Sequence, residues 1–235
     1  MLILNKNILT IGGNRLEGGP LTPPTPPTPV DPYNPLGLPA NTIRIKFSSG
    51  YTPSMGDSRT LVDDNDNVWD IYKQSNDWNS MFYGNTNLLE VLGANTSNIT
   101  HMPFMFRNCS SLTNVALFDT SNVTIIYNMF RNCSSITTSP LFNTSNVTDM
   151  SNMFDSCTSL TTVPLFDTSK VTNMQGMFNG CRNVQSGALA LYQQASSQAN
   201  PPSYHGDTFY NCGSNTQTGY EELNQIPYDW GGYGA

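Results

Sequence analysis

The sequence predicts a β-rich solenoid, which is a stack of 24-residue coils built from short strands and helical turns. Three observations predict it, because cysteines, Met-Phe pairs and tetrads of the type Thr-Ser-Asn-Val all recur at an interval of 24 residues. The regularly spaced cysteines are Cys109, Cys133, Cys157 and Cys181. The Met-Phe pairs begin at Met81, Met105, Met129, Met153 and Met177. A fixed period of this length is typical of proteins in which each repeat forms one coil and neighbouring coils stack.

Two segments of each coil have recognisable patterns. Leu160, Val163 and Leu165 form the pattern L-x-x-L-x-L, the strand signature of a leucine-rich repeat. The spacing of apolar residues further back in the coil favours a short strand at 147–150, followed by a helical turn through the Met153-Phe154 pair. A proline stands before the last leucine of two such strands, so we expect these strands to be short or irregular there.

The stack is expected to occupy residues 81–187 and to be closed at both ends. A fifth cysteine, Cys212, follows the previous one by 31 residues rather than 24, and the insertion around residues 188–198 has a helix-favouring composition. A second short helix is expected at 221–230, so residues 188–235 form a helical C-terminal cap. Residues 41–80 are predicted to form a small β cap, with strands around 43–47 and 68–72.

The N-terminal residues differ in composition from the coils. Apolar residues surround Asn5-Lys6-Asn7 in segment 1–16, which predicts a hairpin with a turn at these three residues. Because a lone hairpin is unstable in water, we expect it to anchor the chain to a partner protein. The predicted anchor residues are Leu2, Ile3, Leu4, Ile8, Leu9 and Ile11. Residues 17–40 are rich in proline and predict an extended spacer, although a disordered tail would have the same composition.

Composition excludes several classes of function. Charged residues make up 11% of the chain, against about 25% in an ordinary soluble domain, and the net charge is −7. Without a basic cluster we expect no nucleic-acid partner, and without a long apolar run we expect no membrane insertion. The apolar residues of segment 1–15 are interrupted by polar ones, so this segment does not have the pattern of a signal peptide.

No catalytic, cofactor or metal site is predicted. The acidic turn at 63–67 lacks the glycine and glutamate spacing of a calcium loop, because Trp69 and Ser75 stand at those positions. No short cysteine pair suits zinc, and the cysteines and histidines share no repeated spacing. We expect the cysteines to form a buried column, with their redox state left open. Turns of the 119–122 type could bind sugars, but turn chemistry explains them equally well.

A BspA-like leucine-rich repeat of bacterial surface proteins closely resembles the string F-N-T-S-N-V-T-D-M-S-N-M-F-D-S-C at residues 142–157. The resemblance extends over residues 81–184 and is of the kind found in gut bacteria and their phages. It implies a display scaffold for binding, associated with adhesion or with phage appendages, and not an enzyme.

Together with the N-terminal anchor, this resemblance gives one expected function and one alternative. The expected function is that of a phage virion protein, a head or tail fibre or decoration, that docks on another virion protein and binds a host-surface glycan or protein. The alternative is a bacterial cell-surface adhesin. The ligand-contacting residues, the receptor, the location on head or tail, and any homo-oligomer stay open.

Overall fold

The computed structural model describes residues 8–11, 14–17 and 31–234. It divides the chain into two units, Met1–Val30 and Asp31–Ala235. In the first unit, strand β1 (Ile8–Ile11) pairs antiparallel with β2 (Asn14–Glu17), and Ile11 lies opposite Asn14. The turn predicted at Asn5-Lys6-Asn7 lies outside the described residues.

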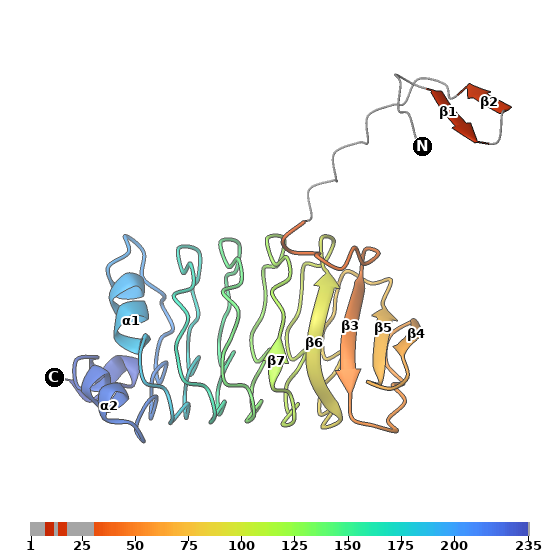
Figure 1. The fold of residues 1–235 in the computed structure, drawn as a ribbon. Helices are drawn as coiled ribbons and strands as arrows, with labels where there is room; N and C mark the ends of the chain where they lie inside the picture. Colours follow the sequence, from red (N-terminus) through yellow and green to blue (C-terminus); the bar gives the residue numbers. More distant parts are fainter. Residues whose placement is uncertain (1–7, 12–13, 18–30, 235) are drawn as a thin grey trace. The chain divides into compact units, whose positions relative to one another are not determined.

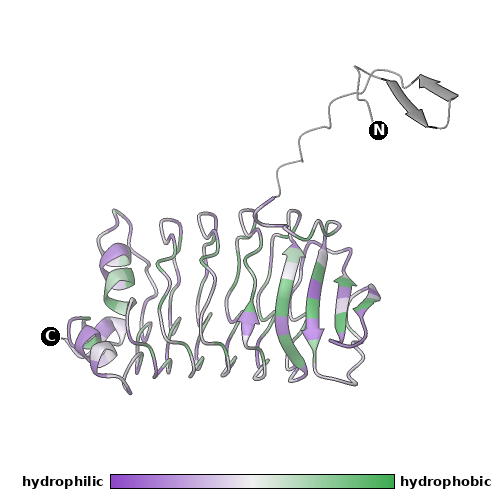
Figure 2. Ribbon diagram, viewed as in Figure 1, coloured by the Kyte–Doolittle hydropathy of each residue, from purple (hydrophilic) through white to green (hydrophobic). Residues whose placement is uncertain are grey.

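A five-stranded sheet begins the second unit, in the order β4-β5-β3-β6-β7 (Figure 1). The strands are β3 (Thr42–Phe47), β4 (Ser58–Asp63), β5 (Val68–Tyr72), β6 (Leu88–Asn95) and β7 (Asn114–Val115). The strands predicted around 43–47 and 68–72 are confirmed by β3 and β5. Apolar and polar residues alternate along β3 (Figure 2), and its inward side chains Ile43, Ile45 and Phe47 are almost fully buried.

This sheet is continuous with the coils, because β6 belongs to the first coil. It pairs antiparallel with β3 on one side and parallel with β7 of the next coil on the other. Residues 31–40 pack on the same unit, since Leu38 is buried and its carbonyl accepts a hydrogen bond from the Asn95 side chain at 2.8 Å. The small β cap therefore extends the hydrogen bonding of the first coil.

Successive coils are held together by backbone hydrogen bonds that repeat every 24 residues. In one coil boundary, the N–H groups of residues 104, 106 and 108 donate to the carbonyls of Tyr127, Met129 and Arg131 at 3.1, 2.9 and 2.8 Å. Isolated bridges such as Asp149 to Asn173 complete the contact. The stack of coils confirms the predicted period, but the short strand at 147–150 is reduced to a single bridge at Asp149.

The helical turn predicted through Met153-Phe154 is also wrong. Residues 151–156 form consecutive turns, and both Asn152 and Ser156 have positive φ, at 52° and 62°. Such residues cannot continue a right-handed helix. The turns instead direct N–H groups toward the next coil, where Asn152 donates to Gln175 and Ser156 to Asn179 at 2.9 and 2.7 Å.

Columns of identical side chains fill the interior of the stack. Rings from successive coils stack face to face, with centroids 5.5 Å apart between Phe82 and Phe106 and 5.4 Å apart between Phe106 and Phe130. The column continues through Phe154 and Phe178 and ends at Phe209. The regularly spaced methionines are buried beside it, as the sequence predicts.

The last leucine of the L-x-x-L-x-L pattern lies outside this core. Leu141 and Leu165 are 60% and 52% exposed, whereas the following residues, Phe142 and Phe166, are buried. The N–H of Phe142 donates to the carbonyl of Pro140 at 3.0 Å, which makes a tight turn that directs the phenylalanine inward. The strand predicted at Leu160 to Leu165 is reduced to a single bridge at Thr162, and the irregularity expected at the proline is confirmed.

Helices close the other end of the stack. The predicted helix at 188–198 is present as α1 (Ala188–Ser196). The expected helix at 221–230 is replaced by α2 (Gln217–Leu223) and a 3-10 turn, η1 (Tyr228–Trp230). The earlier start has a local cause, because the Thr216 side chain accepts a hydrogen bond from the N–H of Gly219 and caps α2. Across the described ranges, no helix is long and apolar enough to cross a membrane.

Candidate ligand-binding face

Each coil carries a turn that holds two residues at positive φ, four positions apart. In the second coil these residues are Phe104 and Asn108, with φ of 56° and 64°. In the third they are Asn128 and Asn132, at 56° and 60°. Asparagine and glycine tolerate this conformation, which explains why they recur at both positions. The turn therefore has the same backbone in every coil.

One position between these two residues changes side chain from coil to coil, and we call it the turn column. Its members are Tyr83, Arg107, Arg131, Asp155, Asn179 and Tyr210. The tyrosines at the two ends are 49% and 45% exposed. Because the backbone beneath is constant, the turn column presents varied side chains on a fixed frame. This arrangement makes it the candidate ligand-binding face.

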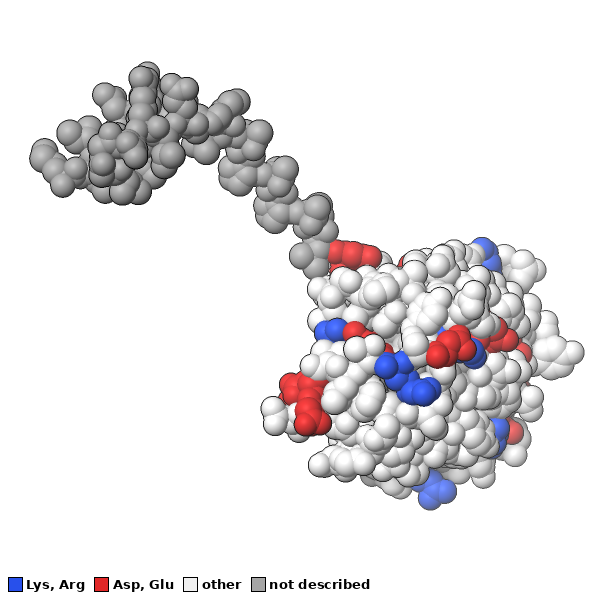
Figure 3. Space-filling view, turned by 90° about the vertical axis from the view of Figure 1, so that its right-hand side faces the viewer, with Lys and Arg blue, Asp and Glu red and all other residues white. Residues whose placement is uncertain are grey.

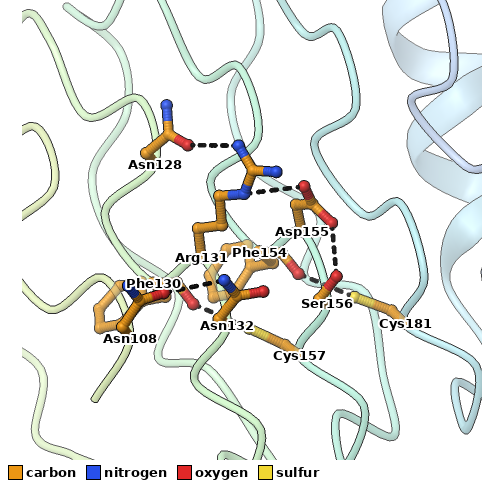
Figure 4. Close-up of polar contacts among 10 residues, drawn as sticks. All are labelled: Asn108, Asn128, Phe130, Arg131, Asn132, Phe154, Asp155, Ser156, Cys157 and Cys181. Carbon is orange, nitrogen blue, oxygen red and sulfur yellow. Dashed lines mark hydrogen bonds and ion pairs between the residues drawn. The ribbon is translucent and has the colours of Figure 1, made fainter. Parts of the chain in front are cut away.

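Two members of the turn column form an ion pair (Figure 4). The Nε atom of Arg131 lies 3.0 Å from Oδ2 of Asp155, whose side chain is 8% exposed. The direction of the N–H does not suit a hydrogen bond, so the contact is an ion pair. Ser156 donates its hydroxyl to the other carboxylate oxygen at 2.7 Å, and Arg131 also reaches Asn128 at 3.4 Å. The charge of Arg131 is therefore neutralised by Asp155 within the protein.

Arg107 has a different environment, because it lies among aromatic rings. Its guanidinium carbon is 5.6 Å from the ring centroid of Tyr83 and 5.4 Å from that of Phe104. Phe104 meets Tyr127 edge to face, with centroids 4.9 Å apart and an interplanar angle of 89°. We call these four residues the aromatic–arginine cluster. Its members come from three consecutive coils, and all are at least partly exposed.

The Thr-Ser-Asn turns, by contrast, use their polar groups within the structure. The hydroxyl of Thr120 donates to the carbonyl of Asn143 at 2.8 Å, and the amide of Asn146 donates to the carbonyl of Ser121 at 2.7 Å. The same threonine contact recurs at Thr144. Coil-to-coil bonding therefore explains these residues, without a sugar ligand.

The cysteines form the predicted buried column. The Sγ atoms of Cys109 and Cys133 donate to the carbonyls of Phe82 and Phe106 at 3.0 Å. Figure 4 shows the next two members, Cys157 and Cys181, with equivalent contacts to Phe130 and Phe154. All five thiols are free, and burial raises the pKa of Cys109 to about 12. Neutral buried thiols are poor nucleophiles, so this column is structural.

Other candidates from the sequence have simple structural roles. In the acidic turn between β4 and β5, Asp63 accepts a hydrogen bond from the N–H of Asn65 at 2.9 Å, as in a hairpin turn. Within the part of the chain that the structure describes, no group of three His, Cys, Asp or Glu residues is arranged to hold a metal ion. Near the C-terminus, Trp230 is buried and its ring stacks on that of His205, with the ring centroids 4.3 Å apart, whereas Tyr228 is 82% exposed.

The predicted anchor residues remain untested. Ile8, Leu9 and Ile11 lie in β1, and Leu2, Ile3 and Leu4 lie outside the described residues. The sequence did not identify the aromatic–arginine cluster. A signal was nevertheless present, because Phe104 occupies the repeat position that holds Asn128 and Asn152 in the next two coils.

Charged groups are sparse on the face of the second unit that Figure 3 presents, where they form small separate groups. Within the small β cap, Arg44 contacts Asp70 at 2.7 Å and Lys46 contacts Asp66 at 2.8 Å. Such exposed pairs contribute little to stability and do not form a large field of one sign.

One family model matches the region of the coils. A family described as "Mycoplasma protein of unknown function, DUF285" matches residues 55–141 and 76–192, which together span more than half of the chain. No curated protein matches the chain.

Two solved structures are similar to the chain. A leucine-rich repeat protein from Bacteroides ovatus is 27% identical over 46% of this chain, with a TM-score of 0.31. The match covers 32% of that protein, so the chain spans about a third of its length. A leucine-rich repeat protein from T. pallidum is 16% identical over 75% of this chain and 96% of its own, also with a TM-score of 0.31. By its family match, the chain belongs to the DUF285 family.

Proposed function

We propose that this chain is a non-enzymatic attachment protein that binds a cell-surface ligand through its turn column. One observation carries the proposal: a constant backbone turn presents side chains that vary among tyrosine, arginine, aspartate and asparagine, and all of them except Asp155 are at least partly exposed. The buried columns are uniform, whereas the turn column is not. Packing requires uniform columns, but it does not require this variation on the surface.

The frame beneath the turn column is suited to binding. Three backbone hydrogen bonds join this part of each coil to the next, and stacked phenylalanine rings support it from inside. A rigid frame loses little conformational entropy when a ligand binds, so a modest number of contacts gives useful affinity.

A cell-attachment assay with the labelled full chain tests this role. Serine substitutions at Tyr83, Asn179 and Tyr210 are expected to reduce attachment by about tenfold, because they remove exposed contacts from the turn column. The matched control changes Leu117, Leu141 and Leu165 to serine, since these side chains are exposed on another part of the coils. Equal loss in both variants would mean that the turn column has no special role.

The proposal extends to a virion protein whose segment 1–16 docks on another virion component. The order of an apolar N-terminal segment, a proline-rich segment and a separate folded unit supports this arrangement. A chain that lacks residues 1–16 should keep its coil stack folded, because that unit has its own core, and should be missing from purified particles. Normal incorporation of this variant contradicts the docking role.

A bacterial cell-surface adhesin is the second candidate. The family description names Mycoplasma, a cellular organism, which favours this alternative. Fractionation of producing cells that release no virus particles separates the two candidates. Recovery of the chain on the outer surface of such cells supports the adhesin, and recovery in particles alone supports the virion protein.

A further inference from the structure

We propose that the aromatic–arginine cluster of Tyr83, Phe104, Arg107 and Tyr127 is a binding site for a saccharide that bears a carboxylate. This inference rests on the proposed attachment function and names the ligand class and the site. Three features of the cluster support it: a residue with unfavourable backbone geometry, a cation without an acidic partner, and a set of partly exposed rings.

The backbone outlier is Phe104, which has a φ of 56°. Among the described residues it is the one aromatic side chain with positive φ. A bulky residue is unfavourable in this conformation, and the next two coils place asparagine at the same position. Folding alone therefore favours asparagine here. The phenylalanine instead supplies a ring that contacts both Arg107 and Tyr127.

The cation is Arg107. Its Nε atom is buried and has no hydrogen-bond partner among the described residues. The ion pairs recorded for this part of the chain involve Arg44, Lys46 and Arg131, and none involves Arg107. Arg131, the next residue of the turn column, is neutralised by Asp155. The positive charge at Arg107 is thus left to attract an anion, and a guanidinium is well matched to a carboxylate.

The rings indicate what kind of molecule carries that carboxylate. Tyr83 is 49% exposed, and Phe104 and Tyr127 are partly exposed beside it. Aromatic rings with a polar edge offer both an apolar face and a hydroxyl group, which suits a sugar ring with one apolar face and several hydroxyls.

An acidic peptide is the competing anionic ligand, and the backbone argues against it. An extended peptide is usually bound by adding hydrogen bonds to a free strand edge. Here the backbone groups are already used between coils, since Gly84 donates to the carbonyl of Arg107 at 2.8 Å and Phe104 donates to that of Tyr127 at 3.1 Å. The cluster therefore offers side-chain donors and ring faces to a ligand, as saccharide recognition requires.

An array of oligosaccharides tests the site with the full chain. It carries sialylated and uronate-containing oligosaccharides, the methyl ester of each, neutral oligosaccharides and a polyglutamate peptide. We expect binding to carboxylated sugars and about tenfold weaker binding to their esters, because esterification removes the charge that pairs with Arg107. Absence of binding to every carboxylated sugar overturns the proposal, and equal binding of polyglutamate or of the esters does so as well.

Variants then assign the binding to the cluster. Arg107→Gln is expected to weaken the preferred sugar by about tenfold, whereas the control Arg182→Gln, at an exposed arginine of a later coil, leaves binding unchanged. Phe104→Asn introduces the residue type that occupies the same position of the turn at Asn128 and Asn152. The melting temperature of this variant should therefore stay at or above that of the parent chain, while sugar binding falls. Full binding by Arg107→Gln overturns the site. If the parent chain attaches to cells but binds no carboxylated sugar, this inference fails and the attachment function stands.

Discussion

Phe104 and Tyr127 contact each other twice across one coil boundary. The N–H of Phe104 donates to the carbonyl of Tyr127 at 3.1 Å, and the two rings meet edge to face at 4.9 Å. The first contact is common to all the coils, because the same turn joins each coil to the next. The second contact is special to this boundary, since asparagine replaces the phenylalanine in the next two coils. This residue pair therefore combines a backbone contact that all coils share with a side-chain contact that is specific to one boundary.

The position of the core predicts very different costs for two apolar substitutions in one coil. Phe130→Ala should lower the free energy of unfolding by about 3–5 kcal/mol, because it removes a buried ring stacked between two others. Leu141→Ala should change it by less than about 0.5 kcal/mol, because that side chain is 60% exposed. Urea unfolding of the two variants measures both values. Similar costs would contradict the placement of Phe130 in the core and of Leu141 on the surface.

The ion pair of Arg131 with Asp155 predicts a loss of stability when the cation is removed. Arg131→Met leaves a carboxylate that is nearly buried without its partner, at a cost of about 2 kcal/mol in the free energy of unfolding. Adding Asp155→Asn should restore part of the loss, since the unpaired charge disappears. An unchanged stability in the single variant would show that solvent screens the pair completely.

The C-terminal cap predicts that one of two neighbouring glutamates matters. The carboxylate of Glu222 accepts hydrogen bonds from the N–H groups of Gly187 and Leu189 at 3.2 and 3.1 Å, at the start of α1. Glu222→Ala should therefore destabilise the protein by about 1–2 kcal/mol. The carboxylate of the exposed neighbour Glu221 accepts a hydrogen bond from the Gln217 side chain on the surface of the same helix, and Glu221→Ala should cost about 0.5 kcal/mol or less. Thermal unfolding compares the two variants, and an equal effect contradicts the capping role.

The buried thiols predict that stability declines in alkaline solution. Burial raises the pKa of Cys109 from its usual value of 9.0 to about 12, and it raises the pKa values of Cys133, Cys157, Cys181 and Cys212 well above 9.0. The folded state keeps these thiols neutral, whereas the unfolded state ionises them above pH 9.0. Their contribution is therefore complete below pH 9.0 and declines above it, and for Cys109 it is lost as the pH rises toward about 12.

Urea unfolding near pH 8 and near pH 10 measures this decline, which amounts to roughly 1 kcal/mol per thiol at the higher pH. Cys157→Ala should show a smaller difference between the two conditions than the parent chain, because it lacks one of the titrating groups. A free energy of unfolding that is the same at both pH values would contradict the burial of the thiols.

Periodicity was sufficient to predict the coil length, the cysteine column and the methionine column, because stacked coils must repeat their buried positions. It could not show which side of the L-x-x-L-x-L segment is buried. That choice depends on a local turn, in which Phe142 donates to Pro140 and leaves Leu141 outside. The length of the strands also depends on contacts that the period does not show. Neighbouring coils pair through isolated bridges, whereas β6 forms a long strand because it pairs with β3.

The aromatic–arginine cluster was harder to predict, because its members are separated by up to two coils in the sequence. Tyr83 and Tyr127 stand 44 positions apart, and the stacking of coils brings Tyr83 against Arg107 and Tyr127 against Phe104. The positive φ of Phe104 is a property of the folded backbone. In the sequence, the cluster is indicated by a phenylalanine at a position where the next two coils have asparagine.

The central claim is that the turn column around Arg107 mediates attachment, and a comparison of two charge-matched variants tests it most directly. Arg107→Gln and Arg182→Gln each remove one positive charge, and the measurement is the attachment of the labelled full chain to cells that bind the parent protein. The account predicts about tenfold weaker attachment for Arg107→Gln and no change for Arg182→Gln. Equal attachment of the two variants would contradict it.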